Sequence, residues 1–434
     1  MRHRAPLGFS AGLMGAALLG ACSPTNGLLT PTPAIFAPTQ DRASVNTARP
    51  ISTSDDLNLL YVTDRAPIAN PQTNALSYGS ERSHIMSFGS IDIRIGPDSS
   101  GAMGEMKLGG VKEIGRFPEV PYPAVVTSAG YRRAPDVVAA HEEAVASLQG
   151  EIRRRLAKTE RKEVVVFIHG YNNTFNDAAD AMGTICHLLG RDFVCVLLTW
   201  PAGGTRGAFL GYNVDIESGE FAVADMRKAI RAIGETEGVR GVDIIAHSRG
   251  AAVLASAFQQ LGREAYVSRS SINESLRVRN IVLFAPDIDI DVASTKIFDV
   301  FSDPDVPYGA KKNPNATIPI KQGSFHITVY SNPADQALGL SSSIFGSTLR
   351  LGQLELSGWQ AKALRPDPGQ LVDLIEVDES TGAFGHGYFL SNPAVGSDLV
   401  ALIRYGLKPG DPGRPLVQIS KAFWRIPEAQ VVAR

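Results

Sequence analysis

One stretch decides the fold of this chain: Val242-Asp243-Ile244-Ile245-Ala246-His247-Ser248-Arg249-Gly250-Ala251-Ala252. A short apolar run ends at Ser248, and small residues with helical spacing follow it. The pattern indicates a tight strand-to-helix turn of the nucleophile-elbow type, which presents one reactive side chain at the top of a sheet. Strand and helix pass close together there, so the residues two before and two after the serine must be small, as Ala246 and Gly250 are. A buried strand followed by a plain serine helix cap is the alternative.

The composition is that of a folded protein with a sizeable core. The chain has 434 residues, of which 44% are hydrophobic and 20% charged, close to the averages for globular domains. The net charge is −2 and no basic stretch is interleaved with aromatic residues, so we expect no binding to nucleic acid. Length alone would allow two or three domains. The composition does not break between residues 57 and 427, which predicts one domain with an N-terminal extension.

The N-terminus has the features of an export signal. Arg2 and Arg4 precede an apolar run over residues 7–19, which is too short to span a bilayer. The run ends in Leu-Gly-Ala-Cys at 19–22, which resembles the lipobox of bacterial lipoproteins. The resemblance implies a cleaved signal peptide over 1–21 and a lipid on Cys22. An ordinary signal peptide that happens to contain Cys22 is the alternative.

The segment after this signal predicts a membrane tether. Residues 22–56 are rich in Pro, Thr, Ala and Asn and have little periodicity, which is typical of a flexible linker. Ser23 after the cysteine favours sorting to the outer membrane in the lipoprotein resemblance. We therefore expect a protein of the bacterial cell envelope that faces the periplasm and is anchored by its lipid.

Two further cysteines, Cys186 and Cys195, fall in an expected helix and in the strand that follows it. An exported protein could pair them, but these two positions need not be close, so we expect two buried free thiols. The chain lacks the paired cysteine spacing of a structural zinc site. The sequence therefore predicts neither a metal nor an organic cofactor.

Strand and helix patterns alternate along the chain. Strands are expected at residues 59–63, 91–95, 164–168, 194–198, 242–246, 280–284, 327–330 and 371–376, and helices at 137–156, 175–189, 218–233, 248–261 and 397–405, with a loop over 101–123. Several of these strands are continuous apolar runs, which is typical of strands buried on both faces. The alternation predicts an α/β fold with a mostly parallel, doubly wound sheet and helices on both faces.

Ligands of such a sheet bind beyond the carboxyl ends of its strands, so the residues just past each strand are the candidates for chemistry. Ser248 follows the strand at 242–246, Asp287 the next strand and Asp335 the one after that. His386 lies in a loop after the strand at 371–376. A serine, an acid and a histidine in this order predict a catalytic triad.

Several motifs together carry a resemblance to a known superfamily. They are Phe-Ile-His-Gly-Tyr-Asn-Asn at 167–173, Thr-Trp-Pro at 199–201, Gly-Tyr-Asn-Val-Asp-Ile-Glu-Ser at 211–218, Ala-His-Ser-Arg-Gly at 246–250 and Ala-Pro-Asp-Ile-Asp at 285–289. With them the chain resembles the α/β-hydrolase superfamily and, more narrowly, a bacterial esterase/lipase-like group of unassigned function. The resemblance covers about residues 57–406. It implies the α/β-hydrolase fold and a serine nucleophile, and it leaves the substrate open.

Each candidate residue has an expected role. Ser248 is the nucleophile and His386 its base. We favour Asp335 as the acid that orients the histidine, with Asp287 as the alternative acid. Turn or helix-cap chemistry would also account for either aspartate.

The tetrahedral oxyanion needs two backbone donors. One is the N–H of Arg249, and the other is the N–H of Gly170 or Tyr171. The Arg249 side chain either faces solvent, pairs with a nearby carboxylate or meets an acidic group of the substrate. His247 is expected to point away from the serine.

These assignments predict a membrane-tethered serine hydrolase that cleaves carboxylic esters, either small molecules or lipids. An acyltransferase or a peptidase would use the same three residues. A non-catalytic interaction protein of the cell envelope on the same fold is the alternative from another class. Residues 337–351 form either a lid over the site or a packed helix.

Overall fold

A computed structural model of the chain describes residues 56–69, 73, 75–97, 103–204, 208–267, 275–302, 325–345, 349–355, 371–378 and 385–427. The predicted signal peptide, Cys22 and the predicted tether as far as residue 55 lie outside the described residues. No helix in the described part of the chain combines the length and the apolar composition that crossing a bilayer requires.

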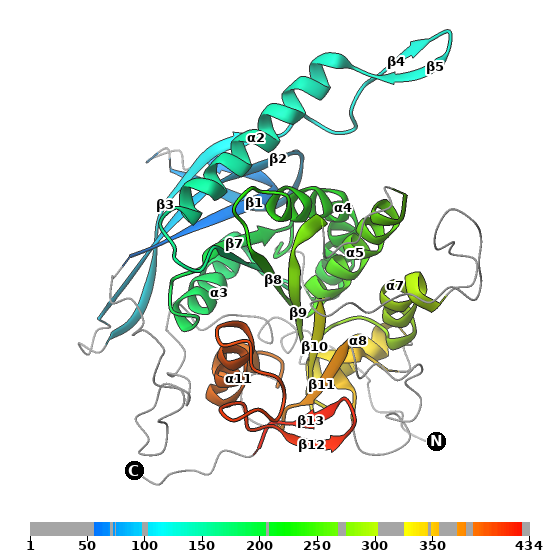
Figure 1. The fold of residues 1–434 in the computed structure, drawn as a ribbon. Helices are drawn as coiled ribbons and strands as arrows, with labels where there is room; N and C mark the ends of the chain where they lie inside the picture. Colours follow the sequence, from blue (N-terminus) through cyan, green and yellow to red (C-terminus); the bar gives the residue numbers. More distant parts are fainter. Residues whose placement is uncertain are drawn as a thin grey trace, which may run out of the picture.

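One large sheet runs through the molecule (Figure 1). In the described residues it has eleven strands, in the order β12-β13-β11-β10-β9-β8-β6-β7-β1-β2-β3. The strands are β1 (Asp56–Ala69), β2 (Leu76–Pro97), β3 (Met103–Arg116), β6 (Glu163–Ile168), β7 (Val194–Thr199), β8 (Gly241–His247), β9 (Val278–Phe284), β10 (His326–Ser331), β11 (Val372–Glu376), β12 (Val417–Ser420) and β13 (Phe423–Arg425). Neighbours from β13 to β1 pair in parallel, whereas β1–β2, β2–β3 and β12–β13 are antiparallel. The predicted mostly parallel sheet is confirmed.

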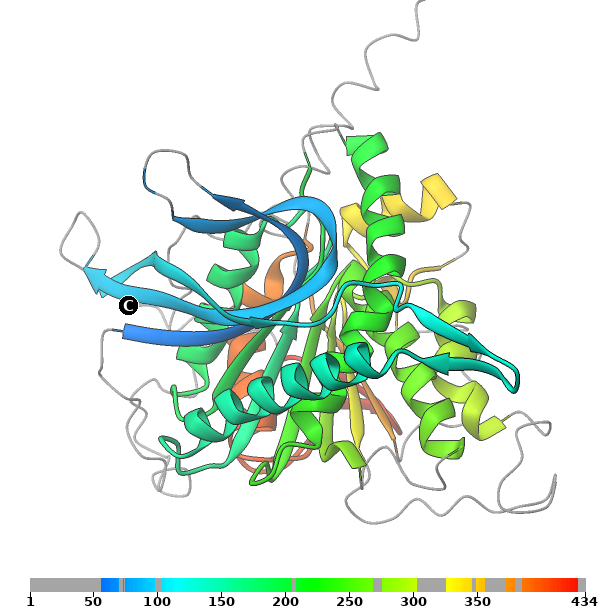
Figure 2. The same cartoon turned by 90° about the horizontal axis from the view of Figure 1, so that it is seen from above.

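Helices cover both faces of this sheet (Figures 1 and 2). The helices are α2 (Pro135–Leu156), α3 (Phe175–Leu188), α4 (Ala208–Gly234), α5 (Arg249–Val267), α7 (Ile290–Ser302), α8 (Gln336–Phe345), α10 (Tyr388–Ser391) and α11 (Pro393–Ile403). Residues of α2, α4, α5 and α7 join one hydrophobic core, and residues of α3, α10 and α11 join a second. Strand β6 shows why: Val164 and Val166 belong to the first core, and Val165 and Phe167 belong to the second. Alternate side chains of a strand point to opposite faces, so a strand covered on both sides is apolar throughout.

The expected loop over residues 101–123 is wrong in its central part. Residues 103–116 form strand β3, which pairs with β2 and ends the sheet. Side chains from Lys107 onward are exposed or partly exposed, and the pairing shifts at several positions. An edge strand with glycines and irregular pairing lacks the apolar alternation by which strands are predicted.

Other boundaries also differ from the expectation. Helix α4 begins at residue 208, ten residues before the expected start at 218. Strands β12 and β13 and a separate hairpin of β4 (Ala124–Thr127) and β5 (Gly130–Arg133) were not expected. These strands are only three or four residues long, which is too short for a clear period.

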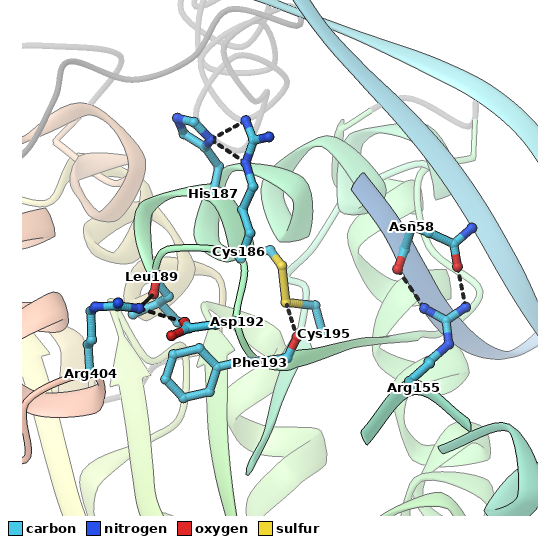
Figure 3. The surroundings of a disulfide bond; sticks show 10 residues. Asn58, Arg155, Cys186, His187, Leu189, Asp192, Phe193, Cys195 and Arg404 are labelled. Carbon is cyan, nitrogen blue, oxygen red and sulfur yellow. Dashed lines mark hydrogen bonds and ion pairs between the residues drawn. A yellow bond between two sulfur atoms is a disulfide. The ribbon is translucent and has the colours of Figure 1, made fainter. Parts of the chain in front are cut away.

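The prediction of two free thiols is wrong, because Cys186 and Cys195 form a disulfide (Figure 3). Cys186 lies in the last turn of α3 and Cys195 near the start of β7. Between them Gly190 and Arg191 adopt positive φ values of 96° and 61°, which reverses the chain tightly. The strand thus starts beneath the helix end, and the two Cα atoms come to 6.1 Å, a distance usual for a disulfide.

Candidate active site

Ser248 occupies the turn between β8 and α5. Its φ of 52° lies in the left-handed region, which residues other than glycine rarely adopt. Its N–H donates to the carbonyl of Phe284 at 2.9 Å, and its own carbonyl accepts from the N–H groups of Ala251 and Asp287, both at 3.1 Å. A plain helix cap would have an extended backbone. The geometry therefore confirms the elbow and rejects the plain cap.

Close packing of the backbone explains why the residues around the serine are small, as expected. A Cβ atom on Gly250 would lie 2.4 Å from the carbonyl oxygen of His169 and 2.8 Å from that of Ile168. Backbone oxygens at these distances leave no room for a side chain. Ala246 is fully buried in the first core, so its methyl group is accommodated where the common pattern has glycine.

His386 and Asp335 form a buried pair. The histidine Nδ1 lies 2.6 Å from Oδ2 of the carboxylate, and each residue is only 1% exposed. Asp335 follows β10, and its Oδ1 accepts the N–H of Leu338 in the first turn of α8. The aspartate therefore caps a helix with one oxygen and holds the histidine with the other. Both sequence interpretations of Asp335 describe the same side chain.

Asp287 contacts a different set of residues from this pair. Its carboxylate accepts hydrogen bonds from the hydroxyls of Tyr212 and Ser341 and lies 3.5 Å from Arg350 Nε. Burial and the Asp287 charge raise the pKa of Tyr212 well above its ordinary value. The structure thus joins His386 to Asp335, and it places the alternative acid in a separate buried network that ties α4 to α8.

His247 contacts and supports the segment that carries His386. Its Nε2 donates to the carbonyl of His386 at 3.3 Å, and its ring stacks on Phe389 with centroids 4.4 Å apart. Burial lowers the pKa of His247 well below its ordinary value. A neutral, packed ring of this kind fixes the position of the His386 segment.

A second support of this segment was not predicted from the sequence. The amide of Asn332 donates to the carbonyl of Gly385 at 2.8 Å. Tyr388 spans the same region, because its hydroxyl donates to the carbonyl of Tyr330 and accepts the N–H of Ala285, both at 2.9 Å. The signal for Asn332 was its place directly after β10, three residues before the predicted acid.

The loop after β6 lies against the serine. A Cβ atom on Gly170 would lie 2.7 Å from the Cβ of Ser248, so the glycine backbone approaches the serine closely. His169 holds this loop: its Nε2 accepts the N–H of Trp200 at 3.1 Å, and its Nδ1 donates to the carbonyl of Gly170 at 2.9 Å. Tyr171, the other predicted oxyanion donor, is buried with its ring 4.9 Å from Tyr212.

Arg65 is a further residue of the site that was not predicted from the sequence. It is 1% exposed, and its guanidinium donates to the carbonyls of Asn173 at 2.7 Å and Ala202 at 2.8 Å and to the Thr199 hydroxyl at 2.8 Å. Burial lowers its pKa to about 10, so it stays charged. This single cation ties the segments after β6 and β7 together. Its signal was its position just past the expected strand at 59–63.

Arg249 begins α5, where the first backbone N–H groups have no partner within the helix. Its side chain is partly buried, and Nη1 lies 3.5 Å from the carbonyl of Asp287. The side chain therefore leans toward the buried network instead of extending into solvent. The backbone N–H lies beside the serine, where an oxyanion would form.

The described residues contain no group of three or more His, Cys, Asp or Glu side chains placed to hold a metal ion. The site instead brings to neighbouring strand ends a strained serine, a histidine–carboxylate pair and a glycine loop. Such an arrangement suits nucleophilic chemistry at a carbonyl group. Of the predicted site residues, only Cys22 lies outside the described chain.

Comparison with known proteins identifies the class. Residues 144–404 match the family described as "Alpha/beta hydrolase of unknown function (DUF900)". The chain belongs to this family, and its fold is the α/β-hydrolase fold. Family membership supports a hydrolase. A search of curated proteins found no match.

Several solved structures are similar to this chain. An esterase from Pyrobaculum calidifontis is 12% identical, with 67% of this chain and 86% of that one covered and a TM-score of 0.27. A putative thioesterase from a Silicibacter species is 13% identical, with 60% and 93% covered and a TM-score of 0.26. At scores this low the overlaps carry no argument about the chemistry of this chain.

Proposed function

We propose that this protein is a serine hydrolase that cleaves carboxylic esters, with Ser248 as nucleophile, His386 as base and Asp335 as the orienting acid. The observation that carries the proposal is the pairing of His386 with Asp335, with the His386 ring 4.9 Å from that of His247, the residue directly before a serine held at positive φ. Strain in a buried turn is retained where function requires it. The substrate class is a small-molecule or lipid ester.

The reaction follows from these contacts. Because Nδ1 of His386 binds Asp335, Nε2 takes the Ser248 proton as Oγ attacks the ester carbonyl carbon. The backbone N–H groups of Arg249 and Gly170 donate to the resulting oxyanion. The imidazolium then gives its proton to the leaving alkoxide oxygen, and the C–O bond breaks to leave an acyl-serine. Water, deprotonated by the same nitrogen, attacks the acyl carbon and frees the acid and the serine.

Labelling with a fluorophosphonate probe tests the nucleophile. We expect one adduct on Ser248 in the folded protein and none in Ser248→Ala. An unlabelled wild-type protein that is folded would favour the non-catalytic interaction protein instead.

A panel of p-nitrophenyl esters of increasing acyl length tests the bond. Turnover that disappears in Ser248→Ala supports the esterase. A protein that is labelled at Ser248, turns over no ester and transfers acyl groups or cleaves peptides would replace the esterase by one of the alternatives that use the same residues.

We also propose that the protein is exported and anchored through a lipid on Cys22. The Cys186–Cys195 disulfide supports this location, because disulfides persist in oxidising compartments outside the cytoplasm. Mass spectrometry of the mature N-terminus tests it: we expect a lipid-modified Cys22 as the first residue. A protein that keeps residues 1–21, or that is cleaved elsewhere without a lipid, contradicts the anchor.

A further inference from the structure

The β4–β5 hairpin stands apart from the main sheet. It forms its own two-stranded sheet, and Figures 1 and 2 show it projecting beyond the N-terminal end of α2, away from the body of the molecule. All eight strand residues are exposed. The hairpin therefore contributes nothing to either hydrophobic core, and its side chains need another explanation.

The tip of the hairpin carries two large apolar side chains. Val126 is 73% exposed and Tyr131 is 85% exposed. The two residues are directly opposite in the register of the strands, so their side chains lie on the same face. Val125, on the other face, is 37% exposed. Exposed apolar side chains that gather at one projecting point are typical of an interaction surface.

The charged residues on the two strands of the hairpin are both basic. Arg132 and Arg133 directly follow Tyr131, and they pair with Val125 and Ala124, on the side of the hairpin nearer α2. The stretch from 120 to 133 contains no Asp or Glu. The hairpin thus has an uncharged tip, from Val126 to Tyr131, and a basic collar behind it.

This order of groups matches an anionic lipid surface. Tyrosine concentrates at the interface between water and hydrocarbon, where its ring is apolar and its hydroxyl stays hydrated. Arginine binds lipid phosphates, and basic groups near an anionic surface are attracted to it. In such a contact the apolar side chains would lie deepest in the membrane, and the cations would lie at the lipid headgroups.

We propose that the β4–β5 hairpin docks the protein on anionic membranes, with Val126 and Tyr131 entering the interface and Arg132 and Arg133 binding the lipid phosphates. Helix α2 serves as the support: its C-terminal half is anchored in the first core through Leu148 and Ile152, while its N-terminal end carries the hairpin. The contact is independent of the serine chemistry, so Ser248→Ala should dock normally.

A local probe at the tip tests the proposal in the full chain. Ser128, in the turn, is replaced by cysteine and labelled with an environment-sensitive fluorophore, with Cys22→Ser present so that the label has one target. We expect a blue shift and an intensity gain of severalfold with vesicles of phosphatidylcholine and 30% phosphatidylglycerol, and little change with phosphatidylcholine alone. Because the readout is local, binding through the N-terminal apolar run does not mimic it.

Variants separate the two contributions. Val126→Ser with Tyr131→Ser should reduce the gain at least fivefold, and Arg132→Gln with Arg133→Gln should abolish the preference for the anionic vesicles. Val417→Ser, at a valine that is 53% exposed on β12, is the matched control and should change nothing. All variants should unfold at the same urea concentration as the parent.

Several outcomes would overturn the proposal. They are a probe that does not respond to vesicles, an equal response with both lipid compositions, and tip variants that respond like the parent. A response that grows with protein concentration in the absence of vesicles would assign the hairpin to contact between copies of this chain instead.

Discussion

Two buried aspartates follow parallel strands at the same edge of the sheet as the serine, and their partners predict different consequences of mutation. Asp335→Asn keeps an oxygen for the Leu338 N–H, so the α8 cap survives, but it removes the carboxylate from His386. We expect kcat to fall by about 10³–10⁴-fold because the wrong histidine tautomer is favoured. Asp287→Asn instead weakens the contacts with Tyr212 and Ser341 and should cost mainly stability.

The two variants are compared by ester turnover and by urea unfolding. A loss of kcat that is larger for Asp287→Asn than for Asp335→Asn, at equal folded fraction, would make Asp287 the acid.

Gly170 shows how closely the loop after β6 approaches the serine. Gly170→Ala would place a methyl group 2.7 Å from Ser248 Cβ and 3.2 Å from His247 Nδ1, so the loop must move away. Removing one oxyanion donor costs about 10²–10³-fold in kcat, and we expect a loss of this order in ester turnover with KM nearly unchanged.

Gly387→Ala is the matched control, because its added Cβ meets no atom within 4 Å in the described part of the chain beyond its two chain neighbours, although it adjoins His386. Its kcat should stay within about twofold of the wild type, since an unhindered methyl on a partly buried residue changes little. Equal losses in the two variants would show that Gly170 has no special role.

Among the elements, α3 and β7 are joined most directly, by the Cys186–Cys195 disulfide (Figure 3). Cys186→Ala with Cys195→Ala should lower the free energy of unfolding by about 2–4 kcal/mol, near the lower end because the closed loop is short. Ester turnover should remain, since Cys195 lies near the start of β7 and the candidate site lies at the other end of the sheet.

Urea unfolding of the wild type with and without dithiothreitol measures this difference. The reduced wild type should match the double variant, and the reductant should leave the variant unchanged. A wild type whose free energy of unfolding is the same with and without dithiothreitol would contradict the contribution of the disulfide.

The elements that could be predicted are those whose pattern of apolar and polar residues reflects how they are buried. Continuous apolar runs such as 164–168 predicted the central strands, because a strand covered on both faces must be apolar. Strand β3 and the β4–β5 hairpin could not be predicted this way, since exposed strands carry mixed residues. The disulfide was missed because it depends on how a turn directs the chain, which composition does not record.

The residues of the candidate site also divide into those that could be predicted from the sequence and those that could not. Ser248, Asp335 and His386 follow strands directly, so topology alone brings them to one edge of the sheet. The roles of Arg65 and Asn332 depend on contacts with residues far away in the chain, such as Arg65 with Asn173 and Ala202. Sequence order could name their positions but not their partners.

Across the whole molecule, the sheet order explains how a site is made from distant segments. Strands β11, β10, β9, β8 and β6 are consecutive neighbours, and the segments after them carry the histidine, the aspartate, the second aspartate, the serine and the glycine loop. All of these strands are parallel, so their carboxyl ends meet at one edge. The site is therefore a property of the sheet as a unit.

Global stability should depend on pH through Asp180 in α3. Burial, with the nearby Asp177 charge, raises its pKa to about 7, and its buried Oδ1 has no hydrogen-bond partner in the described part of the chain. The folded protein therefore binds this proton more tightly than the unfolded chain does between about pH 4 and pH 7. Stability from this group is complete below about pH 4 and is lost as the pH rises to about 7.

Asp180→Asn, which cannot ionise, should remove this loss. We expect it to raise the free energy of unfolding at pH 8 by about 1–3 kcal/mol, allowing for partial exposure to solvent, with a smaller gain at pH 5. Urea unfolding of both proteins at the two pH values measures the difference, in which all other titrations cancel. An equal gain at both values would mean that the asparagine acts through packing, and a loss at pH 8 would mean that the carboxylate is stabilised in the folded state.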